Sequence, residues 1–399
     1  MARTANPEIR LLDGSWYTRD PHRHFRWMRE HAPVYRDESL GGVWGVASYA
    51  GVLRVSKDPE TFCSRMSSRP DAPAIPSMIN MDDPDHRRRR GLVNKGLTPR
   101  RVLDHGPKVR AICHALVDAV AARGECEFVR EIAAPLPMIV IGDLLGVEPE
   151  DRDMLLRWSD DLIAATNATA SLDVIDRAAN TFAEYADYSR RVVADRRARP
   201  RDDMMSVLVH AEIDGEKLGD EDILQEGLLI LVGGDETTRH GITGGMEALI
   251  HHPDQRRRLQ ENPALMPMAV EEMLRWVTPI QNMNRTATRD VDLEGERIRE
   301  GDKVLLLYPS ANRDERAFAR ADEFHVDRDP NDHVAFGHGV HFCLGASLAR
   351  LELKVMFETL LARLPDLGLA SDAPLPRRPS NFIVGIEHMP VVFTPQPVR

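Results

Sequence analysis

One loop constrains this chain more than any other feature of its sequence. The segment 336–345 reads FGHGVHFCLG, and an apolar run typical of a helix, 346–361, follows it directly. A thiolate needs a metal, a cation or backbone N–H donors beside it, because free cysteine is mostly protonated at neutral pH. The glycines at 337, 339 and 345 allow φ values that other residues avoid, so the backbone can fold tightly around Cys343. A helix that begins near Gly345 directs its dipole and free N–H groups at the sulfur. The segment therefore predicts a site for one anionic ligand beneath a flat cofactor.

A lone cysteine in a glycine-rich turn is more often a buried and inert thiol. The full spacing here, Phe-x-x-Gly-x-x-x-Cys-x-Gly, resembles instead the haem-binding loop of the cytochromes P-450, in which a cysteine thiolate is the axial ligand of the haem iron. The resemblance implies a haem b cofactor with Cys343 as the iron ligand. It also implies that Phe336 packs against the haem and the thiolate, that His341 reaches a haem propionate, and that Gly345 belongs to the haem-binding loop.

Composition and charge narrow the class of protein. The 399 residues are 42% hydrophobic, enough for a large core, and their formal charge of -11 argues against general nucleic-acid binding. The four cysteines, at 63, 113, 126 and 343, lie too far apart for a zinc or iron–sulfur set and suit a reducing compartment. The first residues, MARTANPE, lack the apolar stretch of a signal peptide, and the apolar run 228–232 is far short of a membrane span. We expect a cytoplasmic, acidic enzyme of bacterial type without a membrane anchor.

The pattern along the chain is mainly helical. Apolar residues recur at three- and four-residue spacing, which predicts amphipathic helices. A short helix is expected to open at Asp83, with the aspartate as N-cap and Pro84 at the first position. The other predicted helices cover 21–30, 49–55, 100–123, 150–165, 174–199, 220–250, 254–276 and 346–361. Short strands are expected at 34–35, 43–46, 291–293, 298, 304–307 and 382–393, with a turn at 294–295 and a loop at 64–77.

No internal repeat or long linker divides these elements, so we expect residues 1–399 to form one domain. The fold class is mainly α with small β-sheets. The resemblance to the cytochromes P-450 implies their fold, a triangular prism in which a long central helix lies over the haem.

Two adjacent glycines stand in the middle of the predicted helix 220–250. Each costs roughly 1 kcal/mol relative to alanine in a helix, and close helix packing would explain a Gly-Gly pair alone. An acid and an alcohol follow in the sequence GGDETT, 233–238, and a threonine can bond back to the previous turn, bend the helix and open a pocket. The segment resembles the oxygen-binding stretch of the cytochromes P-450. That resemblance implies that Thr237 holds dioxygen and that Glu236 helps to relay protons.

Glu272 and Arg275 stand three residues apart on one face of a predicted helix. Such pairs are usually exposed salt bridges that contribute under about 1 kcal/mol. The surrounding segment 266–276 is apolar, however, so a buried pair is expected here. The two residues resemble the Glu-x-x-Arg pair of the cytochromes P-450, which an arginine before the cysteine loop completes. Arg328 fits that position, and we assign the triad to the structure around the haem.

The run HRRRR, 86–90, invites a nucleic-acid interpretation, which the acidic chain disfavours. His86 and Arg90 are four residues apart and share one helix face, which suits two haem propionates. The arginines at 87–89 spread over the other faces and are expected in solvent. Arg285, in the segment NRTATRD, matches a further propionate ligand of the family.

These motifs stand in the order and at the spacing of the cytochromes P-450, and the resemblance covers about the whole chain. It is closest to actinobacterial members that oxidise the cholesterol side chain, through the segments at 81–84, 134–138, 141–143, 233–240 and 390–395. This implies a monooxygenase that hydroxylates the terminal side-chain carbon of cholesterol or cholest-4-en-3-one, and carries the oxidation onward to the acid. Such an enzyme uses O₂ and electrons from a ferredoxin and an NAD(P)H-linked ferredoxin reductase.

Apolar residues in the regions that the family uses for substrate are expected to line the pocket, although each alone is more often core. They are Ile75, Met78, Ile79, Leu229, Val232, Gly233, Val277, Ile280, Met283, Ile383 and Val384. Basic residues around the cysteine loop are expected to receive the electron donor. They are Arg87, Arg88, Lys95, Arg350 and Lys354.

Two other functions are compatible with a haem-thiolate loop. One is a peroxygenase, or a monooxygenase of another lipid such as a fatty acid or a terpenoid. Peroxygenases tend to lose the acid–alcohol pair, which this chain retains at 236–237. The other is a haem-binding sensor without catalysis, and the sequence holds nothing that resembles an output module or a DNA-binding helix pair.

Overall fold

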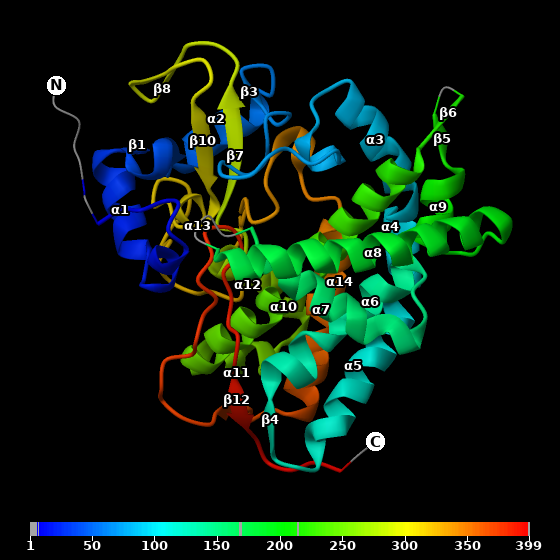
Figure 1. Cartoon of the computed structure of the whole chain (residues 1–399). Helices are drawn as coiled ribbons and strands as arrows, with labels where there is room; N and C mark the ends of the chain where they lie inside the picture. Colours follow the sequence, from blue (N-terminus) through cyan, green and yellow to red (C-terminus); the bar gives the residue numbers. More distant parts are fainter. Residues whose placement is uncertain (1–5, 7, 167–169, 214, 398–399) are drawn as a thin grey trace.

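Helices make up most of the fold (Figure 1). The computed structural model describes residue 6 and residues 8–166, 170–213 and 215–397. Its helices are α1 (His22–His31), α2 (Tyr49–Lys57), α3 (Asp85–Val93), α4 (Pro99–Asp104), α5 (Gly106–Ala121), α6 (Pro135–Leu145), α7 (Arg152–Ala164), α8 (Leu172–Ala198), α9 (Met204–His210), α10 (Asp220–His251), α11 (Pro253–Glu261), α12 (Met266–Val277), α13 (Tyr308–Ala311) and α14 (Ala346–Arg363).

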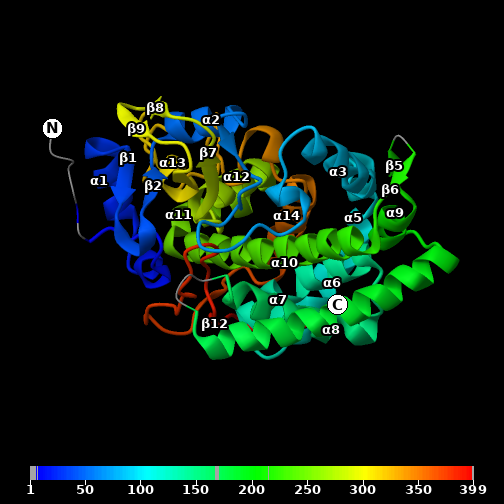
Figure 2. The ribbon, with the colours of Figure 1, turned by 45° about the horizontal axis from the view of Figure 1, so that its top comes forward.

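Helix α10 is the central element. It has 32 residues, runs through the middle of the molecule (Figure 2), and contacts α6, α7, α8, α9, α11, α12 and α14. Its apolar residues are buried on several sides, including Ile223, Leu231, Ile242 and Leu249, as expected for a helix inside a large protein. No helix among the described residues is long and apolar enough to cross a membrane.

The strands are short, and five of them form one sheet beside α1 and α2 on the side of the N-terminus (Figure 1). The order is β1-β2-β10-β7-β3, in which β10 runs parallel to β2 and the other pairs are antiparallel. A second sheet has the order β11-β12-β4, and β5-β6 and β8-β9 are separate hairpins. The strands are β1 (Val34–Asp37), β2 (Val43–Val46), β3 (Phe62–Cys63), β4 (Glu125–Glu127), β5 (Glu212–Ile213), β6 (Glu216–Lys217), β7 (Asn282–Ala287), β8 (Val291–Leu293), β9 (Glu296–Ile298), β10 (Lys303–Leu307), β11 (Gly368–Leu369) and β12 (Pro390–Val392).

The predicted class, mainly α with small sheets, is confirmed, and α1, α2, α7, α8, α10 and α14 lie within a few residues of their predicted bounds. The cap of α3 was predicted one position too early. The helix begins at Asp85 with Pro84 at the N-cap position. The carboxylate of Asp83 still accepts a backbone N–H bond from Arg87, at 3.2 Å.

Two predicted helices are wrong in extent, because prolines divide them. The segment 100–123 breaks between α4 and α5, where Pro107 stands in the first turn of α5, and 254–276 divides into α11 and α12 around Pro263 and Pro267. The segment 382–393 contains one regular strand, β12, instead of several. Sequence patterns also missed α6, whose residues are apolar on all sides, and β7, whose sequence NMNRTA is polar.

Glu272, Arg275 and Arg328 contact one another, as predicted for the triad. Both carboxylate oxygens of Glu272 accept bonds from Arg275, at 2.7 and 2.8 Å, and one of them also accepts from Nε of Arg328 at 2.9 Å. The backbone N–H of His325 adds a bond of 2.8 Å. Glu272 and Arg275 are fully buried, so this network ties α12 to the chain that leads into the cysteine loop.

We expect Glu272→Gln to destabilise the haem-loaded protein by about 3–5 kcal/mol, because two arginines lose the carboxylate that balances their buried charge. Thermal and urea unfolding would measure the change. Asp187→Asn is a matched control, since Asp187 and its partner Arg190 are 73% and 59% exposed, and exposed ion pairs contribute little. Equal unfolding transitions for the two variants would contradict a structural role for the triad.

Candidate active site

The cysteine loop folds back on itself directly before α14. The backbone N–H of Cys343 donates to the carbonyl of Phe336 at 2.9 Å. Gly337 and Gly339 have φ values of +69° and +75°, and a Cβ at Gly339 would lie 2.2 Å from the carbonyl oxygen of Ser56 in α2. Both positions therefore require glycine. The expectation of an unusual φ at Gly345 is wrong, because its φ is −81° and it acts as the residue before the helix.

The side chain of Cys343 is left uncovered by its neighbours. The other described cysteines are buried, whereas the side chain of Cys343 is exposed although protein surrounds it closely enough for burial to raise its pKa. The backbone N–H groups of Gly345 and Ala346 and the cation of Arg90 act in the opposite direction and lower that pKa. The N-terminus of α14 therefore supplies the donors that a thiolate needs.

One face of the central helix, called here the open face, is only partly covered by the rest of the protein. Leu229, Val232, Gly233 and Thr237 follow each other at helical spacing and are all partly or largely exposed. A Cβ at Gly233 would meet no atom within 4 Å, and the hydroxyl of Thr237 donates to the Gly233 carbonyl at 2.9 Å. Gly234 serves a different purpose, since a Cβ there would lie 2.3 Å from the side chain of Ile141 in α6. Only the first glycine therefore belongs to the open face.

Four nitrogen-bearing side chains converge near the cysteine loop. The ring centroids of His86 and His341 are 4.1 Å apart, and Nε2 of each ring lacks a hydrogen-bond partner within the described ranges. Burial, together with Arg285 and His86, lowers the pKa of His341 to about 3. Arg90 donates to the carbonyl of Phe342 at 2.5 Å, and Arg285 on β7 is buried. This arrangement suits the binding of anionic groups.

Known proteins match this chain over nearly its full length. The sequence profile of the family described as "Cytochrome P450" matches residues 168–365. A "Steroid C26-monooxygenase" of Mycobacterium tuberculosis (strain ATCC 25618 / H37Rv) is 51% identical over 99% of this chain and 99% of its own. This chain belongs to the cytochrome P-450 family.

A second relative and a solved structure support the assignment to this family. A "Steroid C26-monooxygenase" of Mycolicibacterium smegmatis (strain ATCC 700084 / mc(2)155) is 51% identical over 98% of this cytochrome P-450 and 97% of its own chain. The crystal structure of P450BioI in complex with hexadec-9Z-enoic acid ligated acyl carrier protein has a TM-score of 0.88 at 33% identity. It covers 95% of this chain and 99% of its own.

The cofactor of this family is haem with a cysteine thiolate ligand, and the residues of this cytochrome P-450 fit it. An uncovered sulfur, an open helix face and two imidazole nitrogens without partners in the described ranges are the features that a haem with its propionates would complete. The ring of Phe336 lies 6.1 Å from that of Phe342, and the guanidinium of Arg350 lies over the ring of Phe336. The iron would be held by Cys343, and the propionates by His86, Arg90, Arg285 and His341.

Glu236, next to Thr237 in the chain, is buried in a network of charges. Its Oε2 is 3.1 Å from Nε2 of His240 and 3.2 Å from Arg378, and Arg239 lies against the other carboxylate oxygen. Asp160 of α7 bonds to both arginines, at 2.9 and 3.2 Å. Sequence reasoning missed Arg378 and Asp160, because they are 218 residues apart and neither stands in a motif.

The predicted pocket residues lie in different surroundings. Leu229, Val232 and Gly233 belong to the open face of α10. Ile79, Ile280 and Met283 are partly buried, Met78 and Ile383 are buried at 7% and 1% exposure, and Ile75 is exposed. Val277 and Val384 line a cavity of about 350 Å³ beside the second half of α10.

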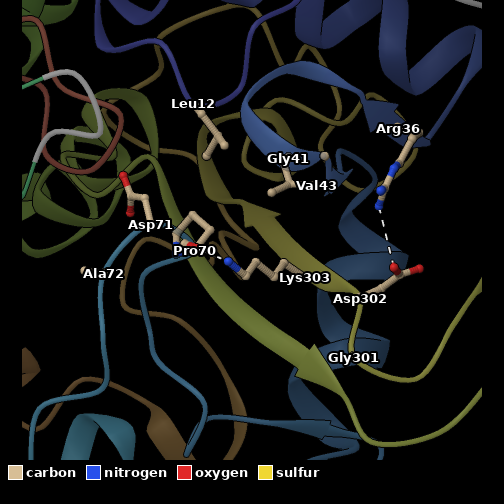
Figure 3. A pocket seen from close by; sticks show the side chains of 11 residues that line it. Leu12, Arg36, Gly41, Val43, Pro70, Asp71, Ala72, Gly301, Asp302 and Lys303 are labelled. Carbon is tan, nitrogen blue, oxygen red and sulfur yellow. Dashed lines mark hydrogen bonds and ion pairs between the residues drawn. The ribbon is translucent and has the colours of Figure 1, made fainter.

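A second cavity, of about 540 Å³, lies at the edge of the five-stranded sheet (Figure 3). Arg36 faces Asp302 across it at 3.7 Å, and Lys303 donates to the carbonyl of Pro70. Its charged groups therefore have protein partners. Its lining residues are Leu12, Arg36, Gly41, Gly42, Val43, Pro70, Asp71, Ala72, Gly301, Asp302 and Lys303, and none of these is a predicted site residue.

Arg89 was expected in solvent, and that expectation is wrong. Its guanidinium lies 2.9 Å from Asp222 and 3.4 Å from Glu226, both on α10. Glu226 is fully buried and also accepts the backbone N–H of Met78, so the pairing secures the loop before α3 to the central helix. The sequence of α3 alone does not indicate which of its arginines meets a carboxylate.

We expect Cys343→His to retain part of the haem, because histidine is also an axial ligand of haem iron. We expect it to lose the strongly red-shifted absorption band of the reduced carbon monoxide complex, because that band requires a thiolate ligand. Haem content and carbon monoxide difference spectra would measure both effects. Cys63→Ser, at a buried cysteine of β3, is the matched control and should keep the band. Persistence of the band in Cys343→His would exclude Cys343 as the ligand.

Proposed function

We propose that this cytochrome P-450 hydroxylates the terminal side-chain carbon of cholesterol or cholest-4-en-3-one and oxidises the product onward to the acid. One observation carries the proposal: a protein named Steroid C26-monooxygenase is 51% identical over 99% of this chain. The matched region includes the segments from which the substrate pocket is expected. The reaction class is therefore that of the family, oxidation of a steroid at C26 rests on the name of the relative, and the particular sterol rests on the resemblance of the sequence motifs.

Haem, when bound, supplies the activation of dioxygen and the insertion of one oxygen atom into a C–H bond. The chain supplies position, protons and the exclusion of water. Leu229 and Val232 give the open face of α10 an apolar wall, and Gly233 leaves room beside it. A hydrocarbon chain fits such a wall because each buried methylene contributes about 0.8 kcal/mol.

Thr237 and Glu236 are the proton-handling pair in this proposal. Since the Thr237 hydroxyl donates to the Gly233 carbonyl, its oxygen keeps acceptor capacity towards the open face. Glu236 is buried in the same helix turn, and His240 and Arg378 contact one of its carboxylate oxygens. Charge-assisted bonds of this kind fix the carboxylate in place, next to the residue that meets the open face.

The proposed electron donor is a ferredoxin, which an NAD(P)H-linked reductase reduces. The side chains of Arg87, Arg350 and Lys354 are 82%, 37% and 44% exposed. Arg350 belongs to α14, directly after the cysteine loop, and bonds Glu271 at 2.7 Å. Basic side chains around this loop would attract an acidic ferredoxin, with an attraction that salt screens over roughly 8–10 Å. The described cysteines are free thiols, which supports a cytoplasmic setting.

We expect Thr237→Ala to bind sterol normally but to divert NADH oxidation into peroxide or water. Loss of a proton-transfer group typically slows the step it serves by about 10²–10⁴-fold. The measurement compares NADH consumed with product formed in the reconstituted system. Thr238→Ala removes a neighbouring buried hydroxyl of α10 and is the control. Unchanged coupling in Thr237→Ala would remove Thr237 from proton delivery.

We expect tight binding of cholest-4-en-3-one and weak binding of androstenedione, which lacks the side chain. The sterol rings are rigid and the side chain is narrow and flexible, so the molecule enters an apolar channel tail-first. Each methylene removed from the tail should weaken binding about fourfold, which corresponds to about 0.8 kcal/mol. Titration of the haem spectrum and product analysis would test this. Ring hydroxylation, or a preference for side-chain-free steroids, would contradict the proposed substrate while leaving the reaction class intact.

A further inference from the structure

A cavity with polar and apolar walls lies beside the second half of α10, beyond the open face towards the C-terminal end of the helix. Its volume is about 350 Å³, and its walls come from the N-terminal segment, the second half of α10, the end of α12 and the segment 384–386. Acidic, basic and hydroxyl side chains line it, including Asp20, Thr243, Glu247 and Arg377. Such a cavity has room for several water molecules, each of which takes about 30 Å³, and offers them hydrogen-bond partners.

His240 lies between this cavity and Glu236. It lines the cavity, is 1% exposed, and stands four residues after Glu236, so the two side chains share one face of the helix. The distance from Nε2 of His240 to Oε2 of Glu236 is 3.1 Å. The other ring nitrogen, Nδ1, has no hydrogen-bond partner within the described part of the chain. A buried polar atom without a partner costs stability, so it needs a reason.

The surroundings of the ring fit a function for both nitrogens. Gly385, another residue of the cavity wall, lies against Nδ1, and a Cβ there would be 1.9 Å from it. The glycine allows the ring to reach its position, because any side chain at 385 would occupy the space of the ring. Burial, with Arg239 and Arg378 nearby, holds the pKa of His240 well below its usual value. The ring is therefore neutral at neutral pH, with a donor on one nitrogen and an acceptor on the other.

We propose that protons reach Glu236 from this cavity through His240. The inference rests on the proposed function, in which Glu236 and Thr237 handle protons. In each transfer Nε2–H gives its proton to Oε2 of Glu236 while Nδ1 takes one from a cavity water, which regains a proton from bulk solvent. Once Glu236 has passed its proton on, the ring turns over, so that the protonated nitrogen again faces Glu236 and the bare nitrogen faces the cavity water. One proton moves, no electron is transferred, and the charge of the ring is unchanged.

His240→Asn is the variant that tests this route. An asparagine amide can still donate a hydrogen bond to Glu236, but it does not pass a proton from one side to the other. We expect product formation to slow by about tenfold or more, less than the 10²–10⁴-fold of a group in direct contact with the reacting atoms, with a larger solvent isotope effect. His22→Asn makes the same substitution at a histidine of the same cavity that has no bond to Glu236, and should behave as wild type.

A second readout does not depend on turnover. In protein labelled with ¹⁵N-histidine and held in the diamagnetic reduced carbon monoxide form, the resonance missing from His240→Asn identifies the ring. We expect its proton on Nε2 and measurable exchange with water. Gly385→Ala keeps the histidine but displaces the ring, so it should alter both the resonance and the coupling, even if His240→Asn fails to fold. A ring proton that does not exchange with water would overturn the proposal.

The outcomes separate this inference from the function beneath it. If Thr237→Ala and Glu236→Gln both remain fully coupled, the proposed proton-handling pair itself fails. If those two variants are uncoupled while His240→Asn and Gly385→Ala keep wild-type coupling, protons reach Glu236 by another route and the role of His240 is wrong. Uncoupling in all four, with wild-type behaviour of His22→Asn, supports the route through His240.

Discussion

An anionic sulfur inside a protein must be stabilised by its surroundings, and the rest of this structure depends on that requirement. Burial raises the pKa of Cys343, and two backbone N–H groups at the start of α14, with the cation of Arg90, oppose the rise. Those donors exist only because α14 begins at Ala346, immediately after the loop. The loop in turn closes only with glycine at 337 and 339, where the backbone has positive φ and passes against α2.

The central helix separates two environments that the reaction has to keep apart. Gly233 and Thr237 belong to its open face and suit an apolar substrate, whereas Glu236, one position before Thr237, is buried among charged groups and contacts His240, which lines the cavity beside the second half of the helix. A helix achieves this because residues one position apart point about 100° away from each other. Thr237 and Glu236 can therefore be neighbours in the chain and still belong to different environments.

Buried charges in this fold are tied to elements that are remote in sequence. Glu272 and Arg275 connect α12 to the segment before the cysteine loop, and Glu236 connects α10 to Arg378 near the C-terminus. Asp160 extends the second network to α7. A buried charge that loses its partner is costly, so each network fixes the relative position of the elements it joins. The first network thus fixes α12 against the segment before the cysteine loop, and the second fixes α10 against α7 and the segment around Arg378.

The sequence by itself determined the features that local chemistry controls. The spacing around Cys343 predicted the haem-thiolate family, and helical periodicity predicted α10 and α14. The adjacent Glu236 and Thr237 led to the prediction that the central helix contributes the proton-handling residues. Outside the motifs of the family, predictions that needed contacts between distant segments were wrong or absent. Neither the partners of Glu236 nor the carboxylates that capture Arg89 stand in a motif, and the polar strand β7 is held by pairing with β10 and β3. The two glycines at 233 and 234 are identical in sequence, and only the tertiary structure gives one to the open face and the other to the packing of α6, because the space around a residue is set by whatever the fold brings against it.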